Sequence, residues 1–94
     1  MLKLGGNLMG THDTIRQQLQ QIDEILQFAE AELNSAKQVQ GGNELKYDEA
    51  QQQLEQMNMQ IESLLRSATP EQREELTRAR QQVNQMQNKM ILGL

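Results

Sequence analysis

Apolar residues recur along this chain every three or four positions, in three separate runs. The first run consists of Ile15, Leu19, Ile22, Leu26, Ala29, Leu33 and Ala36. The second consists of Tyr47, Ala50, Leu54, Met57, Ile61, Leu64 and Ala68, and the third of Leu76, Ala79, Val83, Met86 and Met90. Alternating steps of three and four give a heptad repeat, which is typical of helices packed side by side at a shallow angle. The pattern predicts three α-helices, each with one apolar seam.

The first break between the runs lies at residues 40–43. Its paired Gly41 and Gly42 suit the left-handed end of a helix, and Asn43 can cap the next one with its side-chain oxygen. At the front of the first run, Thr11 or Asp13 can act as the cap, and a carboxylate is favourable at the positive end of a helix. The first helix is therefore predicted near residues 13–40.

The second break carries a stronger signal. Thr69, Pro70 and Gln72 have the order of a capping box, with proline at the first helical position. Proline also disfavours helical geometry at the residue before it. These residues predict a second helix near 43–67 and a third near 70–91.

Connections this short make neighbouring helices antiparallel, so the predicted fold is an all-α, antiparallel three-helix bundle with heptad seams. The alternative is a long helical hairpin in which the third helix continues the second after a kink, and which dimerises to cover its seam. Residues 11–94 are predicted to form a single helical domain. Residues 1–10 have a broken apolar pattern with three glycines and are predicted to be a flexible leader.

The chain has 17 glutamines in 94 residues. Such a content can indicate disorder or aggregation-prone low complexity. Here the glutamines fill the gaps between seam positions and do not interrupt them, and glutamine is a good helix former. We therefore interpret them as the neutral outer surface of a helical scaffold.

The composition excludes most chemistry. The chain has no cysteine, one histidine (His12) and only two aromatic residues. Transition-metal sites draw on imidazole and thiolate, and base-stacking surfaces need aromatic rings. No di-metal Glu-x-x-His motif is present. The sequence predicts no catalytic residues, no cofactor and no metal, and hence a protein that is not an enzyme.

The charge narrows the classes of partner. The formal net charge is −4, whereas nucleic acids and anionic membrane surfaces are bound by basic patches. No stretch approaches the roughly 20 consecutive apolar residues of a membrane span. We expect a cytoplasmic protein that binds neither nucleic acid nor membrane, whose unknown partner is a protein, with a homodimer as one possibility.

Six residues outside the seams are candidates for a partner surface. Phe28 and Met59 are apolar residues away from the seam. Arg73 and Arg80 flank the third seam, where they could pair with acidic residues of the other helices. Ile91 and Leu92 either cover the open end of the bundle against the leader or form an exposed docking tail.

These features predict a non-enzymatic helical protein–protein interaction module that associates with itself or binds another helical protein. The alternative is a small helical regulator or adaptor whose bundle opens to accept a partner helix, a role to which glutamine-flanked seams containing methionine are suited.

Three stretches of the sequence resemble a known family: Tyr47-Asp-Glu-Ala-Gln-Gln-Gln-Leu-Glu, Ser67-Ala-Thr-Pro-Glu-Gln-Arg-Glu-Glu-Leu, and the C-terminal Gln87-Asn-Lys-Met-Ile-Leu-Gly-Leu. The family is a small group of uncharacterised helical proteins of Bacillus-type, spore-forming Firmicutes, known as a domain of unknown function. The resemblance covers roughly residues 12–94 and implies an intracellular protein with no assigned activity. A more distant alternative is a secreted WXG-type helical hairpin, although this chain lacks its tryptophan.

Overall fold

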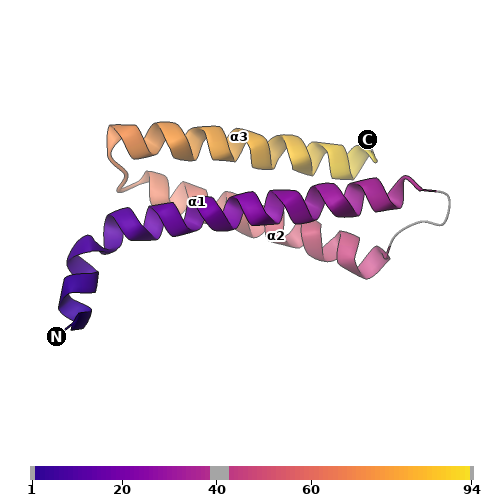
Figure 1. Cartoon of the computed structure of the whole chain (residues 1–94). Helices are drawn as coiled ribbons and strands as arrows, with labels where there is room; N and C mark the ends of the chain where they lie inside the picture. The colour runs from indigo at the N-terminus through magenta and orange to yellow at the C-terminus, as the bar shows by residue number, and fades with distance from the viewer. Residues whose placement is uncertain (1, 39–42, 94) are drawn as a thin grey trace.

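The computed structural model describes the backbone of residues 2–38 and 43–93, and the side chains of residues 14–38 and 43–93. It contains the helices α1 (Leu2–Ala36), α2 (Glu44–Leu65) and α3 (Pro70–Leu92). Each helix packs against both of the others. Because α2 is antiparallel to its two neighbours, α1 and α3 run in the same direction (Figure 1).

This arrangement confirms the predicted antiparallel three-helix bundle. The alternative hairpin is wrong, since α3 folds back along α2 and does not continue it. The WXG-type hairpin is disfavoured as well, because such proteins pack two helices and this chain packs three.

The core coincides with the predicted seams. Its buried apolar side chains are Ile15, Ile22, Ala29, Leu33, Ala50, Leu54, Met57, Ile61, Leu76, Ala79, Val83 and Met90. Ala29 and Ala50 have no exposed surface at all, and small residues at seam positions allow helices to pack closely. Ala36 is exposed although the heptad pattern placed it on the seam, because α1 ends at this residue.

Side-chain caps define the starts of α2 and α3 as predicted. Asn43 accepts hydrogen bonds from the amides of Leu45 and Lys46 at 2.9 and 3.2 Å. The capping box of α3 is complete, since the Thr69 hydroxyl accepts from the Gln72 amide and the Gln72 side-chain carbonyl accepts from the Thr69 amide. Gln72 is also buried, at the position that extends the α3 seam by one step. The predicted glycine cap at 41–42 lies outside the described residues.

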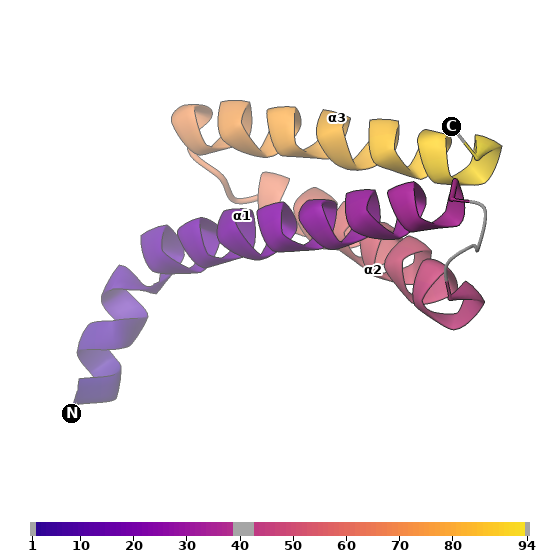
Figure 2. The same ribbon diagram turned by 45° about the vertical axis from the view of Figure 1, so that its right-hand side comes forward.

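The start of α1 differs from the prediction. The helix begins at Leu2, well before the expected start near residue 13 and inside the segment predicted to be a leader. Glycine lowers helix stability by about 1 kcal/mol relative to alanine but keeps its amide donor, so Gly5, Gly6 and Gly10 weaken the helix without ending it. The first turns of α1 bend away from the bundle (Figure 2).

The two ends of the chain lie at opposite ends of the bundle (Figure 1). The expectation that Ile91 and Leu92 cover the bundle against the leader is therefore wrong. In an up-down-up arrangement the C-terminal end of α3 lies beside the C-terminal end of α1. The leader, at the start of α1, is therefore a full helix length away. Ile91 and Leu92 are 71% and 67% exposed.

Truncation of the core at Leu54 tests the role of the seam. The Leu54 side chain is fully buried among all three seams, so Leu54→Ala should lower the free energy of unfolding by about 2–5 kcal/mol. The matched control is Met59→Ala on the exposed side of the same helix. It should change the free energy of unfolding by less than about 0.5 kcal/mol. Urea denaturation followed by circular dichroism measures both. Equal losses in the two variants would contradict the assignment of the core.

Candidate interaction surface

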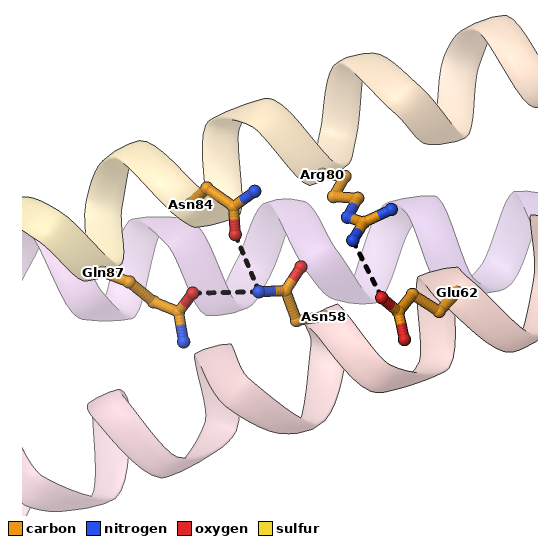
Figure 3. A network of polar contacts seen from close by, with 5 residues as sticks. All are labelled: Asn58, Glu62, Arg80, Asn84 and Gln87. Atoms are coloured by element: carbon orange, nitrogen blue, oxygen red, sulfur yellow. Dashed lines mark hydrogen bonds and ion pairs between the residues drawn. The ribbon is translucent and has the colours of Figure 1, made fainter.

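Polar side chains join α2 to α3. The Asn58 amide donates to the side-chain carbonyls of Asn84 at 2.7 Å and Gln87 at 3.0 Å. One turn further along, Arg80 forms an ion pair with Glu62 at 2.8 Å. Figure 3 shows these groups meeting along one side of the contact between the two helices.

The ion pair confirms part of the expectation for the two arginines, since Arg80 does pair with an acidic residue of a neighbouring helix. Both its members are well exposed, at 39% and 54%, so the pair contributes about 0.2–1 kcal/mol. Arg73 differs from the expectation because its guanidinium donates to the backbone carbonyl of Leu65 at 3.3 Å. It braces the end of α2 where the chain turns into α3.

Tyr47 makes the shortest of the described hydrogen bonds between α2 and α3. Its hydroxyl donates to the backbone carbonyl of Met90 at 2.6 Å and so ties the first turn of α2 to the last turns of α3. Burial raises the pKa of the Tyr47 hydroxyl above its ordinary value, because the charged form would lose solvation.

The helix α1 is attached differently. Within the described residues, its side chains form no hydrogen bond and no ion pair with α2 or α3, and the one bond they do make, from Gln27 to Asp23, lies within α1. Apolar contacts hold it in place. Its residues Leu19, Ile25, Leu26 and Phe28 add to the seam as half-buried side chains.

A shallow groove lies on the outer side of the contact between α1 and α3. It consists of two adjoining hollows of about 190 and 230 Å³ that share Asp23 and Gln82. Seam residues such as Leu19, Ile22 and Met86 line its floor, while exposed polar residues form both edges. We call these two hollows together the α1–α3 groove.

The six residues proposed from the sequence do not gather on one surface. Arg73 lies at the start of α3, and Ile91 lies about 27 Å further along the same helix, at a rise of about 1.5 Å per residue. Met59 is 61% exposed, in the middle of α2. Phe28 is half-buried against the core, although the heptad pattern placed it away from the seam.

Two features of the surface escaped the sequence reasoning. Leu45, in the first turn of α2, is 79% exposed, and it lies at the same end of the bundle as Ile91 and Leu92 (Figure 1). The α1–α3 groove was also missed. Its residues flank the seams, but the heptad pattern alone does not say which flank of each helix faces its neighbour.

The described residues contain no group of three or more histidine or acidic side chains arranged to hold a metal ion. Likewise, none of the three helices, over the residues that the structure describes, is long and apolar enough to cross a membrane.

Comparison with known proteins places the chain in a family. The sequence profile of a family described as "Protein of unknown function (DUF2524)" matches residues 9–92. The chain belongs to this family. It is also 36% identical over 84 residues to "Uncharacterized protein YtzC" of Bacillus subtilis (strain 168), an alignment that covers 89% of this chain and 93% of that protein. No solved structure matches the chain. The resemblance to a small uncharacterised family of Bacillus-type bacteria is thereby confirmed for this member of the DUF2524 family.

The contact between Tyr47 and Met90 gives a pH-dependent prediction. At neutral pH, Tyr47→Phe should lower the free energy of unfolding by about 0.5–1.5 kcal/mol, the usual contribution of one hydrogen bond. The raised pKa means that above about pH 10 the unfolded chain loses the phenol proton before the folded chain does. The advantage of tyrosine is therefore complete below pH 10 and declines above it.

Urea denaturation of both proteins between neutral pH and about pH 11 measures this effect, a range that spans the ordinary tyrosine pKa. A difference that stays constant with pH would contradict the role given to the hydroxyl proton. In the Tyr47→Phe variant, which lacks the hydroxyl, this part of the decline in stability at high pH should be absent.

Proposed function

We propose that this protein is a non-enzymatic helical protein–protein interaction module that associates with itself or binds another helical protein, and that it acts in the cytoplasm. The α1–α3 groove is the single observation that supports this proposal most strongly. It is a shallow, mixed polar and apolar hollow between two parallel helices, with half-buried seam residues such as Leu19 and Met86 at its floor and polar residues on both edges, a surface against which another helix can pack.

The polar contacts between α2 and α3 also favour the α1–α3 face as the binding surface. Asn58, Glu62, Arg80 and Tyr47 are engaged in contacts between α2 and α3, so that contact already has its partners. The groove residues Gln82, Gln85 and Lys89 form no side-chain hydrogen bond with other described residues and are free to meet another chain.

A second candidate function is an adaptor that opens to admit a partner helix. It is favoured by the attachment of α1, which rests on apolar contacts alone within the described residues. Elements of low local stability are the ones that move when a protein exchanges partners. In such an adaptor, a partner helix would take the place of α1 against α2 and α3.

Site-specific photo-cross-linking in the native cell tests the proposed function. A photoreactive amino acid at Gln82, which lines both hollows of the groove, should give a covalent protein adduct. The matched control is the same replacement at Gln52, an exposed glutamine of α2 that lines neither hollow. We expect adducts at Gln82 and none at Gln52, with the attached chain identified by mass spectrometry as a second copy or as another helical protein.

Adducts of equal yield at the two positions, or none at Gln82, would contradict the groove as the interaction site. An adaptor that exchanges α1 would give adducts at the buried seam position Leu76, in addition to those at Gln82.

A further inference from the structure

The two edges of the α1–α3 groove carry charges of mainly opposite sign, acidic on α1 and mainly basic on α3. Asp23 of α1 and Arg78 of α3 line the first hollow, and Glu30 of α1 and Lys89 of α3 line the second. All four side chains are exposed. None of them takes part in an ion pair within 4 Å among the described residues.

The pattern continues towards the start of the bundle. Arg16 lies one heptad before Asp23 on α1, and Glu75 lies one heptad before Gln82 on α3. Both are exposed charged residues. Glu75 lines the first hollow beside Arg78, whereas Arg16 lies beyond the groove. Within the groove the charged residues of the α1 edge are therefore both acidic, and two of the three on the α3 edge are basic.

From this pattern we propose that the face of α1 and α3 that carries the groove binds the same face of a second copy of the chain, placed by a two-fold axis that runs along the helices. Because α1 and α3 are parallel (Figure 1), such an axis sets α1 of one copy against α3 of the other, in the same direction and at the same level. Every charged level then meets its opposite twice, as an isologous dimer requires. The inference rests on the proposed function, since it names the partner that the groove binds.

The other two-fold arrangement is less favourable. An axis across the helices sets α1 against α1 of the second copy in opposite directions. With Asp23 at the centre, Glu30 then faces Arg16, but the two Asp23 carboxylates face each other and Arg78 meets no acidic residue. Like charges placed opposite each other disfavour an interface.

The glutamines of the groove fit a two-fold axis as well. Gln27, Gln82 and Gln85 line it between the charged levels. A glutamine amide both donates and accepts hydrogen bonds, so Gln27 of one copy can pair with a glutamine of α3 in the other. The interface would be polar, and an association of modest affinity that weakens with salt is expected.

Charge reversal combined with mixing tests this dimer. Sedimentation equilibrium of the full chain at about 100–500 µM, a range suited to weak interfaces, should give twice the 10.8 kDa mass of one chain at low salt. Glu30→Lys places the new lysine opposite Lys89 of the second copy. Lys89→Glu places two acidic side chains opposite each other. Each variant alone should dissociate about tenfold or more readily.

A mixture of the two variants should regain association. In the mixed dimer both Glu30–Lys89 levels again join opposite charges, one of them reversed. This recovery cannot arise from contacts within one chain, because each variant keeps its own unfavourable pair. Glu55→Lys, the same change of charge on an exposed α2 residue outside both hollows, is the control and should leave the mass unchanged.

Three outcomes would overturn the proposed parallel dimer. A wild-type chain that stays at the monomer mass excludes a second copy as the occupant, and adducts of another protein at Gln82 would then leave the proposed function standing. Dissociation of both variants without recovery on mixing indicates the opposite orientation, in which Glu30 faces Arg16. Changes in unfolding temperature without any change in mass mean that the charges act within one chain.

Discussion

The bundle depends on one constraint, the heptad spacing of its apolar residues. A 3.5-residue period keeps each seam facing the same direction over the length of a helix, so that three amphipathic segments can bury their seams against one another. Small residues such as Ala29 and Ala50 let the backbones approach, and larger ones such as Leu54 and Ile61 fill the space between them. The chain has only two aromatic residues and no cysteine, so the aliphatic seams supply most of the buried apolar surface.

Polar contacts then distinguish the three pairs of helices. The pair α2–α3 has a connecting turn closed by a capping box, amide contacts around Asn58, an ion pair and the Tyr47 hydroxyl bond. The helix α1 packs against this pair through apolar contacts. The consequence is an uneven bundle. The contact between α2 and α3 is closed by polar bonds, while the contact between α1 and α3 leaves a groove whose charged edges have no ion-pair partner among the residues that the structure describes.

The sequence was sufficient for everything that depends on periodicity and local chemistry. The seams, the capping box at Thr69 and the cap at Asn43 follow from residue types at fixed spacings. The helix start at Leu2 could not be predicted in this way, because glycines weaken a helix without ending it. Surface positions such as Phe28 and Gln82 depend on which flank of each seam meets its neighbour, and two mirror arrangements of three helices have the same heptad pattern. Family membership adds no chemistry, because the family is itself described as one of unknown function.

The α1–α3 face is the surface on which we propose that a second chain binds. Nuclear magnetic resonance of the isotopically labelled full chain, diluted from about 500 to about 20 µM, reports that face residue by residue across the range in which a weak dimer dissociates. The amide signals that move with concentration should lie around Asp23–Glu30 of α1 and Arg78–Lys89 of α3. Added salt should move these signals in the same direction as dilution. Signals that move only at the end of the bundle formed by Leu45, Ile91 and Leu92, or that do not move at all, would contradict this binding surface.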